Sequence, residues 1–122
     1  MHLIGDIGNT DIKICLFDNN CKLIKKIRIK TYLLSKNYLS KNLKFIKSYK
    51  LKIKKVLFSS VVPLAYKEIK KFISQSINIK CIELKQLRLN NILKIKVNKK
   101  QIGSDRLANA ISVINNKKNY II

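Results

Sequence analysis

Acidic residues are scarce in this sequence. Six Asp and Glu stand against 27 Lys and Arg, which gives a formal net charge of +21 over 122 residues. Long apolar runs are also missing, because no stretch reaches the roughly 18 residues that a membrane helix needs. Asp6 interrupts the N-terminus too early for a secretory signal. Since hydrophobic residues still make up 47% of the chain, we expect a folded, soluble, cytoplasmic protein without a membrane partner.

Arginine is rare although lysine is abundant. It occurs only at positions 28, 88 and 106, whereas the lysines are spread over every segment. Reading of specific bases relies on bidentate contacts from arginine, so we predict no specific nucleic-acid partner. The dominance of Lys, Ile and Asn, whose codons are rich in A and T, is the composition expected of an AT-rich genome. A small basic nucleic-acid-binding module stays open as an alternative function.

Cysteine and histidine give no sign of a metal centre. The three cysteines, Cys15, Cys21 and Cys81, are odd in number and form no Cys-x-x-Cys pair. We interpret them as small core thiols in a reducing compartment, not as a disulfide framework or a metal site. The single histidine, His2, lies at the chain end and is expected to take no part in function.

The apolar pattern predicts a mixed α/β domain. A short apolar run at 3–7, followed by alternation over 12–17 and about 22–30 with turn residues between, is typical of three consecutive antiparallel strands that form a meander. Helices are then expected to begin at Ser35 (burying Leu39, Leu43 and Ile46), at Pro63 (burying Ala65, Ile69, Phe72 and Ile73) and at Gly103. Further strands are expected at 56–58, about 79–82 and from Tyr120, while 92–97 reads as a strand or an extended arm. We therefore predict one α/β domain over 1–122, with helices packed on a mixed sheet.

The first turn of the meander is a candidate phosphate site. In Asp6-Ile7-Gly8-Asn9-Thr10, glycine lets the backbone approach a phosphate, and turn amides and the Thr10 hydroxyl can donate to its oxygens. Lys13 adds a positive charge, and Asp6 is a candidate ligand for a Mg²⁺ that bridges phosphates. The alternative is an ordinary hairpin turn, because Gly-Asn is favourable turn chemistry.

A second polar turn, Gly103-Ser104-Asp105-Arg106, opens the last predicted helix. Asp105 can be a simple cap favoured by the helix dipole, but Arg106 opposes that dipole and so needs another reason. Gripping a substrate carboxylate is such a reason, and Asp105 could then accept a proton from an alcohol. A third stretch, 59–63, follows a buried strand; we interpret it as a capping loop, with ligand contact as the alternative.

Together these motifs resemble the type III pantothenate kinases, members of the acetate/sugar kinase–Hsp70–actin superfamily. The matching residues are Asp6 to Thr10 with Lys13, then Phe58 to Pro63, then Gly103 to Ala110. The resemblance runs along the whole chain and covers the N-terminal half of the family. It implies one half of a ribonuclease H-like or actin-like ATPase fold. It also implies a kinase that transfers phosphate from ATP to pantothenate, giving 4'-phosphopantothenate in the first step of coenzyme A biosynthesis.

The resemblance further implies which residues form the site. ATP is bound by eight consecutive residues: Asp6, Ile7, Gly8, Asn9, Thr10, Asp11, Ile12 and Lys13. Pantothenate is bound by Gly103, Ser104, Asp105 and Arg106, with Asp105 as the catalytic proton acceptor and Arg106 on the substrate carboxylate. The cofactors implied are ATP, Mg²⁺ on Asp6 and a monovalent cation, K⁺ or NH₄⁺. The typical assembly is a homodimer.

The sequence departs from this family at Asp11, in the segment 98–101, which lacks the proline often found before Gly103, and in length. Asp11 stands where an uncharged residue is usual, and a carboxylate beside phosphates is unfavourable unless it points away or helps to hold metal. Family members are about twice as long, as expected of a two-domain kinase, and their second half supplies another phosphate turn and the monovalent-cation ligand. We therefore expect that this chain is an N-terminal domain truncated before the second domain. We expect this single domain to bind phosphate weakly and to turn over little or no substrate. A transcription-accessory protein without kinase activity is the alternative within the family.

Overall fold

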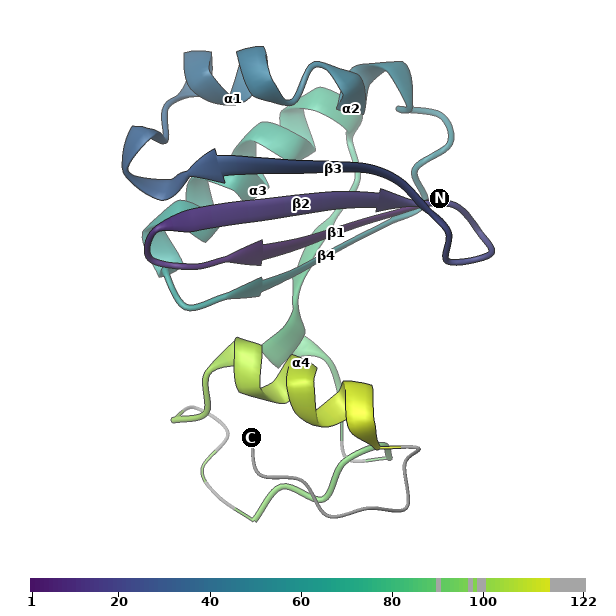
Figure 1. Cartoon of the computed structure of the whole chain (residues 1–122), viewed down its shortest axis with the longest axis vertical. Helices are drawn as coiled ribbons and strands as arrows, with labels where there is room; N and C mark the ends of the chain where they lie inside the picture. Colours follow the sequence, from purple (N-terminus) through teal and green to yellow (C-terminus); the bar gives the residue numbers. More distant parts are fainter. Residues whose placement is uncertain (90, 97, 99–100, 115–122) are drawn as a thin grey trace.

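A mixed sheet forms the centre of the molecule (Figure 1). The computed structural model describes all residues except 90, 97, 99–100 and 115–122. Within that part, the strands are β1 (His2–Ile7), β2 (Asp11–Phe17), β3 (Leu23–Lys30), β4 (Lys55–Ser60) and β5 (Cys81–Glu83). Their spatial order is β3-β2-β1-β4-β5. β1, β2 and β3 pair antiparallel, whereas β4 lies parallel to both β1 and β5. The predicted α/β class and the opening meander are confirmed.

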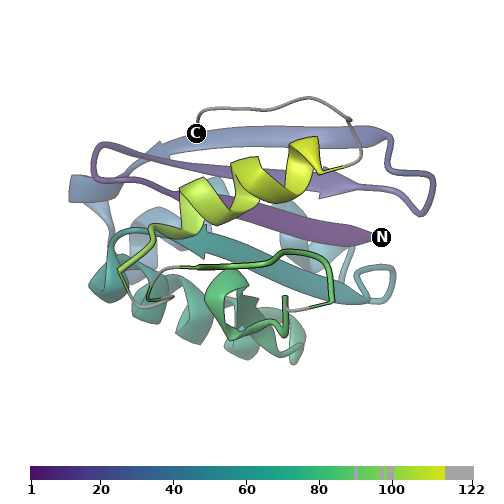
Figure 2. The same ribbon diagram turned by 90° about the horizontal axis from the view of Figure 1, so that it is seen from below.

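Helices cover the two faces of the sheet unequally. Three of them, α1 (Lys36–Asn42), α2 (Phe45–Ser48) and α3 (Pro63–Ile77), lie on one face (Figure 1). On the other face, α4 (Ser104–Val113) crosses in front of the strands (Figure 2). Two 3-10 turns, η1 (Thr31–Leu33) and η2 (Leu84–Gln86), follow β3 and β5. None of the helices described is long and apolar enough to cross a membrane.

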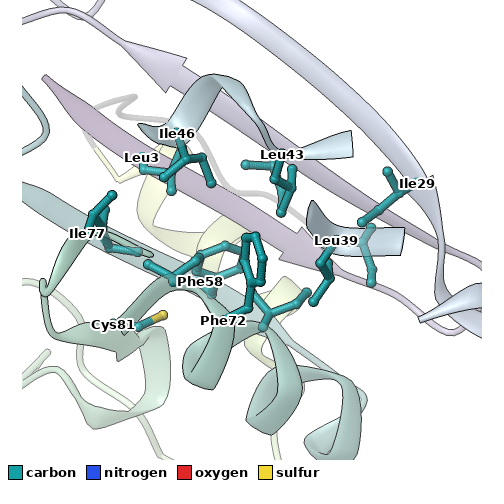
Figure 3. Close-up of a cluster of buried hydrophobic side chains, with 14 of the residues drawn as sticks. Leu3, Ile29, Leu39, Leu43, Ile46, Phe58, Phe72, Ile77 and Cys81 are labelled. Carbon is teal, nitrogen blue, oxygen red and sulfur yellow. The ribbon is translucent and has the colours of Figure 1, made fainter. Parts of the chain in front are cut away.

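Two apolar clusters hold these layers together. The larger one lies between the sheet and α1 to α3, where Leu3 and Phe58 from the strands meet Leu39, Ile46 and Phe72 from the helices (Figure 3). The smaller cluster lies under α4 and is built on the buried residues Leu84, Leu89 and Leu107. Burial of apolar surface in the larger cluster therefore holds α1 to α3 against the sheet, and burial in the smaller cluster holds α4 against it.

Local signals in the sequence explain where the helices begin and end. The Ser35 hydroxyl accepts the Tyr38 amide at 3.2 Å and caps α1. Pro63 stands at the first turn of α3, where its missing amide hydrogen costs nothing. Asn78 ends α3 in the left-handed conformation, with φ of 55°. All four residues predicted to be buried on α3 are buried: Ala65, Ile69, Phe72 and Ile73.

Several predicted elements differ from the structure in their bounds or type, among them the strand expected at about 79–82, which is β5 at Cys81–Glu83. The helix predicted from Ser35 is interrupted at Leu43, which leaves helical geometry with φ of −110° and ψ of 22°, although Leu39, Leu43 and Ile46 are all buried. β4 runs through Ser59 and Ser60, which had been assigned to the loop after it. The described residues of 92–97 form no strand. Their alternation arises because Leu93 and Ile95 pack on the smaller cluster while Lys94 and Lys96 are exposed. The strand predicted from Tyr120 lies outside the described residues.

Gly5 lets the centre of the sheet pack closely on the larger core. A Cβ atom placed at Gly5 would overlap the aromatic ring of Phe58, its neighbour in the parallel register of β1 and β4. Both residues are buried, and Phe58 has no exposed surface. A larger residue at this position would therefore force the ring out of its place.

We predict that Gly5→Ala lowers the free energy of unfolding by about 1–3 kcal/mol, because overpacking displaces Phe58. Urea denaturation of the 122-residue chain measures this loss. Phe58→Leu opens space beside the new methyl group, so the double variant should lose less than the sum of the two single losses. Strict additivity of the two substitutions would contradict the proposed overlap.

Candidate functional site

A cleft of about 360 Å³ lies on the sheet face that α4 partly covers. Its polar lining residues come from five elements and are Asp6, Lys13, Lys26, Ser59, Asp105 and Asn109. Asp6 is paired in register with Lys13 on one side and with Ser59 on the other, so these three side chains form a row across the sheet. Ile4, Cys15 and Phe17 supply apolar surface beside this row. The cleft thus combines a polar row of Asp6, Lys13 and Ser59 with apolar surface, and Lys26 lies beside the apolar residue Cys15.

The alternating pattern of β1 and β2 places these residues on the cleft face. Leu3, Gly5 and Ile7 of β1 are buried toward the larger core, so Asp6 points to the opposite side. In β2 the buried residues are Ile12, Ile14 and Leu16, which leaves Lys13 and Cys15 on the cleft face. The strand pattern alone therefore determines that Asp6 and Lys13 share one face.

α4 brings Asp105 over this face from the other end of the chain. Leu107 is buried in the smaller cluster, and the fully buried Ser104 hydroxyl donates a hydrogen bond to the Glu83 carboxylate. Glu83 also accepts the Lys85 amide at 2.8 Å, so one carboxylate ties β5, η2 and α4 together. At Gly103 a Cβ atom would overlap the Asp105 carboxylate, so the absent side chain leaves room for that group.

The turn between β1 and β2 is held by hydrogen bonds and leaves the side chains of Asn9 and Thr10 accessible. The Gly8 amide donates to the Asp11 carbonyl at 3.0 Å and closes the hairpin. Behind the turn, the Thr31 hydroxyl donates to the Gly8 carbonyl at 2.8 Å, and the Thr31 amide donates to the Thr10 carbonyl at 3.0 Å. Asn9 and Thr10 themselves are exposed. The turn is therefore held in place by η1 while its outer side remains open to a ligand.

Comparison with known proteins assigns the chain to a family. The family model for type III pantothenate kinase matches residues 2–122. The chain belongs to the type III pantothenate kinase family. It is 50% identical over 122 residues to a protein of Pelagibacter ubique named type III pantothenate kinase, and 31% identical over 128 residues to one of the same name from Desulforapulum autotrophicum. Both matches include the whole of this chain but only 49% and 48% of the relatives. The chain thus spans about half the length of the curated relatives it matches.

The structure brings together three residues predicted from the pantothenate kinase motifs. Asp6 and Lys13 from the first turn line the same cleft as Asp105 from the start of α4. Asp105 is separated from Asp6 and Lys13 by about three quarters of the sequence, so no local pattern dictates that it meets them. Their meeting in one cleft is the arrangement that a phosphate site beside a proton acceptor requires.

Other predicted residues have different surroundings. Ile7 and Ile12 are fully buried in the larger core, so they can meet a ligand only through backbone groups. The Ser104 hydroxyl is directed to Glu83, which leaves its backbone amide at the start of α4 as the group for a substrate. Arg106 is exposed and is not among the residues that line the cleft. The binding roles of these residues remain predictions.

Asp11 points toward β3. Its carboxylate accepts a hydrogen bond from Arg28 Nη2 and lies 2.9 Å from Lys30 Nζ. Hydrogen bonds from Arg28, and to a smaller extent from Lys30, lower the pKa of Asp11 below its usual value. The hydrogen bond to Asp11 in turn raises the pKa of Arg28. Two cations therefore neutralise the Asp11 carboxylate, which stands where the resemblance predicts an uncharged residue. The carboxylate is directed to β3 and not to the phosphate turn.

The interpretation of all three cysteines as core thiols is wrong for two of them. Cys81 is buried, and burial raises the pKa of its thiol to about 11. Cys21 is exposed in the turn between β2 and β3, with φ of 60°. Cys15 is half-buried and lines the cleft, because it alternates with the core residues Ile14 and Leu16.

Two polar residues of the cleft, Asn109 and Lys26, were not among the predicted site residues, and a third, Ser59, lies in the stretch 59–63 for which ligand contact was the alternative interpretation. Asn109 follows Asp105 by four positions, and this helical spacing could have identified it. Ser59 lies opposite Asp6 in register, and its Oγ is buried without a hydrogen-bond partner among the described residues. Lys26 comes from β3, where its alternation with the core-facing Ile27 and Ile29 could have identified its face.

The carboxylates of the cleft suit a Mg²⁺ held mainly by a ligand's phosphates. Within the described residues, no group of three or more His, Cys, Asp or Glu could hold a metal ion. Mg²⁺ typically binds one or two carboxylates together with water and substrate phosphates, so it does not need such a cluster. Asp6 and Asp105, which face the same cleft, fit this mode of binding.

We predict that Asp11→Asn destabilises the chain near pH 7 and that this difference disappears in acid. The native pKa of Asp11 is lowered, so its stabilisation is present above the unfolded value near 4 and is lost as the pH falls through the native value. Urea denaturation midpoints of the parent and the variant between pH 7 and pH 2 measure this. Glu68→Gln, at an exposed site on α3, is the charge-matched control. A difference independent of pH would contradict the ion-pair role.

Proposed function

We propose that this cleft is the phosphate- and pantothenate-binding part of an ATP-dependent pantothenate kinase. The reaction is phosphorylation of the primary hydroxyl of pantothenate to 4'-phosphopantothenate, the first step of coenzyme A biosynthesis. The observation that carries the proposal is that Asp6, Lys13 and Asp105 line one cleft, in a chain of the type III pantothenate kinase family. The family model and both relatives bear the name type III pantothenate kinase, which favours a kinase over the nucleic-acid-binding and transcription-accessory alternatives.

The turn of residues 6–13 would hold the phosphates of ATP. The exposed positions Asn9 and Thr10 offer an amide, a hydroxyl and backbone donors, and Lys13 adds a positive charge. Phosphoryl transfer depends mainly on positioning and on neutralising charge, so these groups need no covalent role. Mg²⁺ bound to the phosphates would supply further positive charge, with Asp6 as the carboxylate of this chain that contacts it.

Asp105 would accept the proton of the pantothenate hydroxyl. As that oxygen bonds to the γ-phosphorus, the bond from phosphorus to the β,γ-bridging oxygen breaks and ADP leaves, while the hydroxyl proton passes to the Asp105 carboxylate. Gly103 leaves space for this carboxylate, and the buried Ser104 fixes the helix that bears it. Arg106, one position further along α4, would bind the substrate carboxylate.

The remaining parts of the proposal rest on the family alone. They are a monovalent cation, K⁺ or NH₄⁺, a homodimeric assembly and a cytoplasmic location. We also propose that residues 1–122 act as the N-terminal ATPase domain, and that a second domain completes the grip on ATP. The relatives have about twice the length of this chain, which is consistent with such a division.

The test is pantothenate binding to the 122-residue chain in the presence of MgATP, followed by NMR. We expect shifts in the amides of 103–109, and about tenfold or greater weakening in Arg106→Ala, the loss expected when a hydrogen-bonded charge pair is removed. Arg88→Ala, which removes another exposed arginine, should bind like the parent chain. An absence of pantothenate-dependent shifts at 103–109 would overturn the substrate assignment.

Turnover by the same preparation is expected to be small or absent, because half of the nucleotide grip is assigned to a second domain. A coupled assay for ADP release with pantothenate measures it, and Asp105→Asn is the control. A robust pantothenate-dependent rate that Asp105→Asn abolishes would support the kinase assignment and contradict the need for a second domain.

A further inference from the structure

Lys26 is a second cation in the cleft, and it comes from a different strand from Lys13. It lies on β3 opposite Cys15. Cys15 follows Lys13 by two residues on β2, so Lys26 lies two positions along the strands from Lys13. Two residues along a strand correspond to about 7 Å, and the neighbouring strand lies about 5 Å away. The two lysines are therefore attached about 8–9 Å apart, a separation that their flexible side chains can close around one extended anion.

The other two cations on this face of β3 are already paired. Arg28 and Lys30 follow Lys26 at intervals of two residues, so all three point to the cleft side of the strand. Asp11 binds Arg28 and Lys30. In the part of the chain that the structure describes, no carboxylate forms an ion pair with Lys26 or with Lys13. Among the described residues, the cleft thus retains two ammonium groups without an ion pair, one beside Cys15 on β3 and one two positions from Cys15 on β2.

We propose that Lys26 binds the phosphate chain of the nucleotide together with Lys13. The inference rests on the proposed function and adds to it a phosphate contact outside the turn of residues 6–13. The anion best matched to two separated ammonium groups is a polyphosphate, whose charges are distributed along a chain. Asp11 has a positioning role in this arrangement, because it keeps Arg28 and Lys30 from competing for the same phosphates.

Neighbouring positions on β3 provide a matched control. Lys25 carries the same charge but points to the opposite face, where its Nζ lies 5.2 Å from the centre of the Phe45 ring. Lys26→Ala and Lys25→Ala therefore remove equal charge from one strand, and only the first removes it from the cleft. Affinity for MgATP and for AMP can be measured by calorimetry on the 122-residue chain and both variants, at a temperature where all are folded.

We expect Lys26→Ala to weaken MgATP binding by roughly two- to fivefold, the range measured for exposed ion pairs. Lys25→Ala should leave that affinity unchanged. The effect of Lys26→Ala should be larger for MgATP than for AMP, which has one phosphate, and Lys26→Arg should restore binding. A structural role for Lys26 would instead lower the melting temperature and would affect both nucleotides equally.

The outcomes separate this inference from the proposed function. If the parent chain binds MgATP with an affinity that falls equally in Lys26→Ala and Lys25→Ala, or that falls in neither variant, the role of Lys26 is overturned and the kinase proposal stays intact. If the parent chain fails to bind MgATP at millimolar concentration and gives the same signal as Lys13→Ala, both the role of Lys26 and the proposed kinase function are overturned.

Discussion

The hydrogen bond from the buried Ser104 hydroxyl to the Glu83 carboxylate fixes the position on which the candidate site depends. Glu83 ends β5 and caps η2, so this bond ties the start of α4 to the edge of the sheet. Leu107 adds apolar anchoring one turn further along. A hydrogen bond from a fully buried hydroxyl is costly to break, because the hydroxyl then loses its compensation for desolvation. Asp105, between these anchors, is thereby held over the cleft.

The sheet provides the other half of the site through its two-residue period. One set of side chains from β1 and β2 is buried against α1 to α3, and the alternate set, with Asp6 and Lys13, faces the cleft. The same residues that stabilise the fold therefore determine the direction of the polar ones. A shift of one residue in register would exchange the two sets, so the placement of the cleft residues and the packing of the core are coupled.

Much of this fold follows from patterns that act locally. The alternation of β1 and β2, the Ser35 cap and Pro63 at the start of α3 predict those elements correctly, because each depends on residues within one turn or one strand. The break between α1 and α2 was missed, since Leu39, Leu43 and Ile46 keep a helical spacing across it. Asp6, Lys13 and Asp105 could be nominated from motifs, but their common cleft depends on contacts between distant segments. Alternation with Ile27 and Ile29 sets the face taken by Lys26, but its level beside Cys15 depends on the pairing of β2 with β3, which the sequence does not reveal.

The central claim is that the first turn and the start of α4 form one nucleotide cleft. Paramagnetic broadening by Mn·ATP, followed in the NMR spectrum of the 122-residue chain, tests it most directly. The account predicts that amides of residues 8–13 and of residues 104–109 broaden together at the same low ratio of Mn·ATP to protein. Amides of α1 and α2, on the opposite face of the sheet, should remain sharp at that ratio. Broadening confined to only one of the two segments, or centred on α1 and α2, would contradict the claim.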